Sequence, residues 1–262
     1  MCGIAGYSLS PDSGVERTLA AQALLAGIAE RGADAAGYAR RAPGGGVVVY
    51  KQRSGASALL DRIQVPDATT DVLLHVRDYT KGHPTIDANN HPIRHGAVVG
   101  VHNGIIFNDD EVLAEYGFER AEPGMTVDSE AIFALVEHSH ARAYVLAELR
   151  GSMAAAWLDE RQEGFVYCAR GAGRPLWLGE AAGATFFAST QHALELVEAY
   201  ARLRLTKREL PEGIVVTLER GSVVRREEFA PNRSFDERPL PAVRAPHEGR
   251  LTLQRLAALA AL

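Results

Sequence analysis

The chain has 262 residues and a formal net charge of −5, without the basic excess that nucleic acid or an anionic membrane surface would require. Its two cysteines, Cys2 and Cys168, are too few for a disulfide framework or a Cys/His zinc site, so no metal is expected. No signal-peptide pattern and no run of 18 apolar residues is visible, which predicts a cytoplasmic protein without membrane spans.

Short apolar runs predict strands along the whole chain, and several are apolar at consecutive positions, as is typical of strands buried on both faces. The predicted strands are 2–9, 47–52, 72–76, 97–102, 153–158, 165–169, 185–188 and 214–218. The predicted helices are 15–31, 128–138, 141–150 and 191–203. Two groups of strands with helices grouped between them favour sheets covered by helices.

The C-terminal part has a different composition. Residues 228–248 are rich in proline, arginine and charge, which predicts an extended arm. Residues 249–262 contain good helix formers with a leucine-rich face, which predicts a terminal helix. That helix either docks on its own domain or packs on a partner, and the sequence leaves both open.

Cys2 directly follows the initiator methionine, which aminopeptidases remove readily when the next side chain is small. Removal would leave a thiol and a free α-amine on one residue. The amine has an ordinary pKa of about 7.7–8.0, so it can accept a proton near neutral pH beside a strong nucleophile. The alternative is that Cys2 is a small residue opening a buried strand.

Four further motifs follow Cys2, and each alone is a weak signal. Residues 31–37 (RGADAAG) are typical of a turn, and the Asn-Gly pair in 102–108 (HNGIIFN) is typical of a tight turn closing a strand. Residues 127–130 (VDSE) are typical of a helix cap. The fourth motif is 75–82 (HVRDYTKG).

In order and spacing, these motifs together with Cys2 resemble the class II glutamine amidotransferase domain, the N-terminal-nucleophile type. The resemblance runs from residue 1 to about 225, so we assign 1–227 to that domain, 228–248 to the arm and 249–262 to the helix. The HNGIIFN segment is most similar to the glucosamine-6-phosphate synthase type. The sequence of the RGADAAG segment is intermediate between that type and the amidophosphoribosyltransferase type. The resemblance implies an α+β fold, a four-layer α/β/β/α sandwich with two stacked antiparallel sheets, and no cofactor.

The resemblance also implies roles for five residues. Cys2 aligns with the nucleophile, and the Asn103 side chain and Gly104 N–H align with the oxyanion hole. Arg77 aligns with the arginine that holds the glutamine α-carboxylate, and Asp128 with the acid that holds the α-ammonium. Both charges of a free amino acid are thereby required, which selects L-glutamine over peptides and simple amides.

The remaining candidates are supporting residues. Arg31 aligns with an arginine near the nucleophile, with a surface salt bridge as the alternative, and Asp34 is expected to stabilise its own loop. Thr80 and Gly82 fit the R-x-x-T-x-G pattern of the loop that lines the glutamine pocket. Three positions in this loop depart from the synthase type and are expected to affect loop closure rather than chemistry: Asp78, Tyr79 and Lys81.

Histidine is not needed as a base if the α-amine accepts the proton. The sequence therefore favours structural roles for His75, His83, His91 and His102, and Cys168 is expected to be inert in a buried strand.

The predicted reaction is hydrolysis of L-glutamine to L-glutamate and ammonia through a Cys2 thioester. Because no acceptor domain or nucleotide-binding motif follows the domain, we expect a free-standing amidotransferase subunit that delivers ammonia to a separate synthase or acceptor subunit. Two rivals remain: an N-terminal-nucleophile amidohydrolase acting on another amide, and a non-catalytic regulatory module on the same fold.

Overall fold

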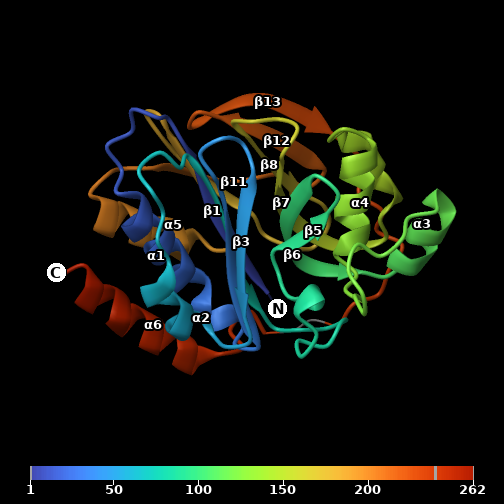
Figure 1. Ribbon diagram of the computed structural model, residues 1–262, viewed down its shortest axis with the longest axis horizontal. Coiled ribbons are helices and arrows are strands. Elements are labelled where there is room, and N and C mark those ends of the chain that lie inside the picture. The colour runs from blue at the N-terminus through green and yellow to red at the C-terminus, as the bar shows by residue number, and fades with distance from the viewer. Residues whose placement is uncertain (1, 239–240, 262) are drawn as a thin grey trace.

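Two antiparallel sheets stack face to face, with helices on both outer faces of the sandwich (Figure 1). The structure is a computed structural model, and it describes residues 2–238 and 241–261. The α/β/β/α layering predicted from the sequence is confirmed.

The first sheet has seven strands in the order β11-β9-β10-β1-β4-β2-β3, and its inner strands are buried on both faces. Its strands are β1 (Gly3–Leu9), β2 (Ala35–Arg41), β3 (Val47–Gln52), β4 (Asp71–Arg77), β9 (Trp177–Ala181), β10 (Ala184–Ala188) and β11 (Thr206–Glu209). The second sheet has six strands in the order β13-β12-β8-β7-β6-β5. Its strands are β5 (Ile93–His95), β6 (Val98–Ile106), β7 (Gly151–Asp159), β8 (Phe165–Arg170), β12 (Ile214–Glu219) and β13 (Ser222–Glu228).

The helices form the outer layers. α1 (Arg17–Ile28) and α5 (Gln191–Ala201) cover the seven-stranded sheet, and α4 (Glu130–His138) packs on β5 and β6. The shorter helices are α2 (Ala56–Leu59), α3 (Asp109–Tyr116) and the 3₁₀ helices η1 (Ala29–Arg31), η2 (Leu60–Arg62), η3 (Asp87–Asn89) and η4 (Ala143–Glu148). Among the described residues, none of these helices has the length and apolar character to cross a membrane.

Side chains from the two sheets meet in a dry layer between them. Ile4 of β1 and Leu73 of β4 pack there against Val99 and Val101 of β6. Alternate residues of a strand face the same side. Cys2 lies two residues before Ile4, and Asn103 lies two residues after Val101. Both side chains are therefore directed into one end of the inter-sheet layer.

The predicted strands all occur, but the sequence missed five further ones. β2 was expected to be part of a turn, and the predicted strand at 97–102 continues through the Asn-Gly pair to Ile106. The 141–150 helix is wrong in type, because the segment forms the 3₁₀ helix η4. The edge strand β13 is mostly exposed and contains only two apolar residues, Val223 and Val224, which gave no apolar run to detect.

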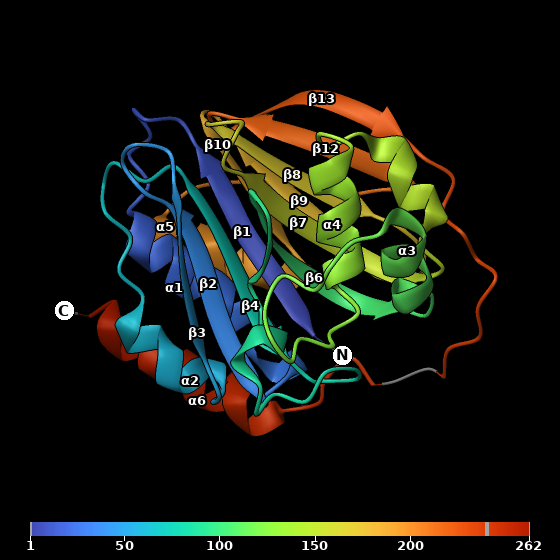
Figure 2. The ribbon, with the colours of Figure 1, turned by 45° about the vertical axis from the view of Figure 1, so that its right-hand side comes forward.

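The C-terminal segment runs back along the body to the end where Cys2 lies, as the orange and red trace in Figure 2 shows. Phe235 stacks on Phe107 with ring centroids 5.7 Å apart, and Glu237 pairs with Arg174. Farther along, Arg244 Nε lies 3.1 Å from an Asp78 carboxylate oxygen. The segment is therefore attached to the two-sheet body at several points.

The terminal helix α6 begins at Pro246 and ends at Leu259. It packs on α1, α2 and η1, with Leu256 fully buried and Leu253 half-buried against the same core. In this structure its apolar face thus docks on its own domain, which was one of the two arrangements that the sequence left open.

Candidate active site

The candidate nucleophile and the candidate oxyanion residue come from different sheets, and both are directed into the layer between them. Cys2 directly precedes β1 and shares its face with Ile4, while Asn103 on β6 shares its face with Val101. Cys2 is half-buried and Asn103 is fully buried. The site therefore exists only where both sheets are stacked.

The side-chain amide of Asn103 is buried, and neither its Oδ1 nor its Nδ2 has a hydrogen-bond partner among the described residues. A buried amide without partners is costly and calls for an explanation. Gly104 follows it with a φ of +152°, and a Cβ there would lie 1.9 Å from the Ser152 carbonyl oxygen. Glycine is therefore required at this point of β6.

Cys2 is held through its backbone. Arg31 Nε donates a 2.8 Å hydrogen bond to the Cys2 carbonyl, so Arg31 fixes the start of β1 and is buried rather than on the surface. The thiol contacts the Asp78 carbonyl oxygen at 3.5 Å. Burial raises the pKa of the Cys2 thiol, which leaves little thiolate near neutral pH. The expected removal of Met1 concerns a residue outside the described range.

Arg77 ends β4 on the same inter-sheet face, and its guanidinium is occupied. Nη1 donates to the Asn89 carbonyl and to Asn90 Oδ1 (2.7 Å). Nη2 donates to the carbonyls of Lys81 (3.0 Å) and Gly82. In this conformation Arg77 binds the loop that follows it, and its terminal N–H groups are not open to a ligand carboxylate.

Asp128 lies immediately before α4 and is 3% exposed. Its Oδ2 accepts a 2.7 Å hydrogen bond from the Ile106 N–H, at the end of β6. Burial raises the pKa of this carboxyl group to about 6, against the lowering effect of that hydrogen bond. Ser129 occupies the N-cap position of α4, but its side chain makes no capping hydrogen bond to the helix. Its hydroxyl oxygen instead lies 2.8 Å from His102 Nδ1.

Most of these residues line one small cavity; Asn103 and Arg31 do not. Its walls include Cys2, Arg77, Thr80, Lys81, His91, Gly104 and Asp128. Its volume is about 10 Å³, room for roughly one water molecule. A larger, open hollow of about 470 Å³ lies over α5, but its lining offers no nucleophile. The chemistry of the small cavity identifies it as the candidate site despite its size.

The histidines near the cavity are neutral. Burial lowers the pKa values of His75 and His102 to about 3, and lowers that of His91 well below its ordinary value. His75 Nε2 contacts the His102 carbonyl at 3.1 Å, and its ring stacks on His91 at 4.1 Å. His83 is exposed and contacts Thr85. Among the described residues, no group of three or more His, Cys, Asp or Glu could hold a metal ion.

Several residues at the site were missed or misplaced by the sequence. Asn89 and Asn90, which bind Arg77, resemble ordinary turn residues in the sequence. Asp34 was expected to stabilise its own loop, but its carboxylate accepts a 2.9 Å bond from the Tyr79 N–H and so supports the loop after Arg77. Thr80 lines the cavity, whereas Gly82 contributes its carbonyl to Arg77.

Comparisons with known proteins show which family the chain belongs to. A family model described as a glutamine amidotransferase domain matches residues 80–196. The glutamine–fructose-6-phosphate aminotransferase (isomerizing) of Geobacillus kaustophilus is 32% identical over 253 residues, which cover 87% of this chain and 39% of that protein. The chain carries a class II glutamine amidotransferase domain.

Solved structures show that the amidotransferase domain has the N-terminal-nucleophile fold. The glutamine phosphoribosylpyrophosphate amidotransferase of B. subtilis has a TM-score of 0.66 at 19% identity, covering 87% of this chain and 49% of that chain. A glutamine aminotransferase class-II domain protein from Silicibacter pomeroyi has a TM-score of 0.52 at 17% identity, covering 88% of this chain and 100% of that chain. The amidotransferase chain spans about two fifths of the length of the curated relatives that it matches.

Proposed function

We propose that this protein hydrolyses L-glutamine to L-glutamate and ammonia through a thioester on Cys2. The observation that carries the proposal is that Cys2, Gly104, Arg77 and Asp128 line one cavity, next to the buried and unpartnered amide of Asn103. A nucleophile, an oxyanion site and groups for both charges of an amino acid then share one cavity.

The reaction requires a tetrahedral oxyanion. The Cys2 sulfur attacks the carboxamide carbon, and the new C–S bond forms as the carbonyl oxygen takes negative charge. Asn103 Nδ2, which has no partner among the described residues, is available to donate to that oxygen. The C–N bond then breaks, the leaving nitrogen takes a proton as ammonia, and water hydrolyses the thioester to glutamate and free thiol.

The proton acceptor that we assign is the α-amine of Cys2 after removal of Met1. The buried thiol has a raised pKa and needs a base to become a thiolate. The buried histidines are poor bases because burial holds their pKa values far below neutral. An α-amine on the nucleophile itself titrates at about 7.7–8.0 when unperturbed.

We further infer that the ammonia passes to an acceptor site on a separate polypeptide. The curated relatives are named as aminotransferases that use fructose 6-phosphate, and this chain covers 39% of the first of them. The match to the Silicibacter pomeroyi chain, in contrast, covers the whole of that chain. A reactive thiol also needs a reducing compartment, which supports the predicted cytoplasmic location.

Intact-mass measurement followed by labelling tests the function. We expect a mass without Met1, glutaminase activity, and one equivalent of label from a diazo-ketone glutamine analogue on Cys2. Asparagine, peptide amides and acyl lactones should be poor substrates; preference for one of them would establish the rival amidohydrolase. A retained Met1 with no labelling would instead indicate a non-catalytic module.

The affinity for glutamine should depend on the protonation of Asp128. Its pKa is raised to about 6, so the carboxyl group is ionised above that pH and increasingly neutral below it. A neutral Asp128 cannot pair with the substrate ammonium, so kcat/KM should fall as the pH drops from 7 to 5. Because protonation of the α-amine lowers kcat/KM as well, the wild type should fall more steeply below pH 6 than the amine alone requires. Asp128→Asn should have low kcat/KM at pH 7 and keep only the limb of the amine; an equally steep fall below pH 6 in the variant would contradict the assignment.

A further inference from the structure

The two groups assigned to the charges of glutamine belong to different sides of the sandwich. Arg77 is the last residue of β4, in the seven-stranded sheet. Asp128 lies just before α4, which packs on β5 and β6 of the six-stranded sheet. The carboxylate and the ammonium of an α-amino acid are bonded to one carbon. Arg77 and Asp128 can therefore bind both charges at once only if their spacing is fixed.

Asn89, the last residue of η3, is fully buried and holds the Arg77 side of this pair. Its backbone carbonyl accepts a hydrogen bond from Arg77 Nη1. Asn90 accepts from the same nitrogen through its Oδ1, at 2.7 Å. Because a guanidinium is planar, two acceptors on one terminal nitrogen fix the direction of the whole group.

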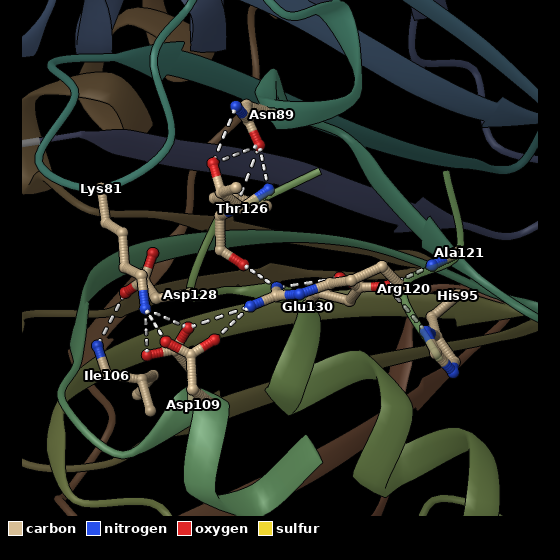
Figure 3. Close-up of polar contacts among 12 residues, drawn as sticks. Lys81, Asn89, His95, Ile106, Asp109, Arg120, Ala121, Thr126, Asp128 and Glu130 are labelled. Carbon is tan, nitrogen blue, oxygen red and sulfur yellow. Dashed lines mark hydrogen bonds and ion pairs between the residues drawn. The ribbon is translucent and has the colours of Figure 1, made fainter. Parts of the chain in front are cut away.

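The side chain of Asn89 holds the segment that leads to Asp128. Its Oδ1 accepts from the backbone N–H groups of Thr126 (2.7 Å) and Val127 (3.0 Å), directly before Asp128 (Figure 3). Its Nδ2 donates to the His83 carbonyl at 3.2 Å. An amide supplies both the acceptor for two backbone donors and the donor for a carbonyl, so asparagine suits this position.

The Asp128 segment is fixed to its own side of the sandwich by separate contacts. The Ile106 N–H donates to Asp128 Oδ2 at 2.7 Å, and Arg120 Nη1 donates to the Val127 carbonyl at 3.0 Å. Neither of these two contacts involves Arg77. Asn89, in contrast, is hydrogen-bonded to Arg77 and to the segment before Asp128, and so joins the two charge-binding sides of the cavity.

Burial and close packing make this link rigid. Asn89 and Val127 are both buried. A Cβ at Gly82 would lie 2.9 Å from Asn89 Cγ and 3.0 Å from Val127 Cα, so the backbone of Gly82 packs directly on both. A buried N–H group that loses its acceptor is costly, and the link is therefore expected to keep one geometry.

We propose that Asn89 is a positioning residue that sets the spacing between Arg77 and Asp128. A ligand with both charges of an α-amino acid is thereby preferred over a ligand with the carboxylate alone. The inference rests on the proposed function for the identity of the substrate. Cys2 and Asn103 are not hydrogen-bonded to Asn89, so its replacement should weaken binding and spare the chemical step.

The test compares L-glutamate with glutarate, which is the same dicarboxylate without the α-ammonium. Each ligand is titrated for protection of Cys2 against iodoacetamide, which is followed by peptide mass. Cys168 is fully buried and does not compete. The ratio of the two protection constants does not depend on the folded fraction of a variant, because unfolded chains bind neither ligand.

Asn89→Ala should weaken protection by L-glutamate about tenfold and leave protection by glutarate unchanged, because the backbone carbonyl that binds Arg77 is retained. The glutamine KM should rise by a similar factor, with kcat within about twofold of the wild type. Asn89→Asp keeps the acceptor oxygen and adds a negative charge, so its preference for L-glutamate should not fall below that of the wild type. If Asn89→Ala does not fold, Asn89→Ser is measured in its place.

Asn90→Ala is the matched contrast. It also removes a buried asparagine contact to Arg77, but the Asn90 side-chain nitrogen donates to the Pro84 carbonyl (2.9 Å) rather than binding the segment before Asp128. L-Glutamate and glutarate both carry a carboxylate for Arg77. Protection by the two ligands should therefore weaken in parallel, with their ratio as in the wild type.

A wild-type ratio in Asn89→Ala, or an equal loss of preference in Asn89→Asp or Asn90→Ala, would overturn the proposal while leaving the proposed function intact. A lowered kcat at unchanged KM in Asn89→Ala would do the same. If the wild type hydrolyses no glutamine, the proposed function fails and the protection ratio alone decides the role of Asn89. A wild type that does not distinguish the two ligands would refute both.

Discussion

Replacing Cys2 by serine is expected to reduce glutamine hydrolysis by at least about 10³-fold. A hydroxyl group is a much weaker nucleophile than a thiolate, and burial keeps the cavity histidines His91 and His102 neutral, so they cannot compensate. The fold should be unaffected, because among the described residues the Cys2 sulfur has one hydrogen-bond partner, the Asp78 carbonyl. Initial rates of glutamate release measure the loss.

Cys168→Ala is the matched control for this experiment. Cys168 is fully buried between the sheets, and burial raises the pKa of its thiol well above the ordinary value. Its replacement should cost stability but leave the activity of each folded molecule unchanged. Equal losses in the Cys168 and Cys2 variants, or covalent labelling of a Cys2→Ser protein at another site, would show that the nucleophile is misassigned.

Asn103→Ala is expected to lower kcat by about 10²–10³-fold with little change in KM. The amide would donate to the oxyanion, which exists only in the transition state and the tetrahedral intermediate. Because neither polar atom of Asn103 has a partner among the described residues, its removal should not lower the melting temperature.

Asn108 serves as the control, because its replacement is expected to lower stability and not kcat. It lies beyond the end of β6, with its side chain bonded to the Glu148 carbonyl (2.9 Å) and the Arg150 N–H (2.8 Å). Asn108→Ala should therefore be less stable but catalytically normal when folded. An Asn103→Ala protein that loses stability while keeping kcat would remove Asn103 from the oxyanion site.

The sequence predicted the layers and the buried strands because their apolar residues are consecutive. It missed β2 because 31–37 is composed of residues that favour turns. In the folded chain, a Cβ at Gly37 would lie 2.2 Å from the His91 carbonyl oxygen, so the small residue reflects close backbone packing. The Asn-Gly pair likewise lies inside β6, where Gly104 pairs with Met153 of β7.

The candidate site was predicted as a set of residues, but not in its conformation. Motif order indicated Arg77 and Asp128, yet it could not show that Arg77 bonds to its own loop, since those partners are backbone carbonyls. Lys81 was noted as a departure from the synthase pattern. Its partners Asp109 and Asp110 become neighbours only when α3 folds beside the loop, which local sequence does not encode.

The split of the site between two sheets has a consequence for biosynthesis. Cys2 leaves the ribosome among the first residues, whereas Asn103 arrives much later and its strand β6 needs β7 as a hydrogen-bonded neighbour. A nascent chain consequently carries its nucleophile long before it can stabilise an oxyanion. The growing polypeptide is thus expected to stay inert toward glutamine until its central strands have emerged and assembled.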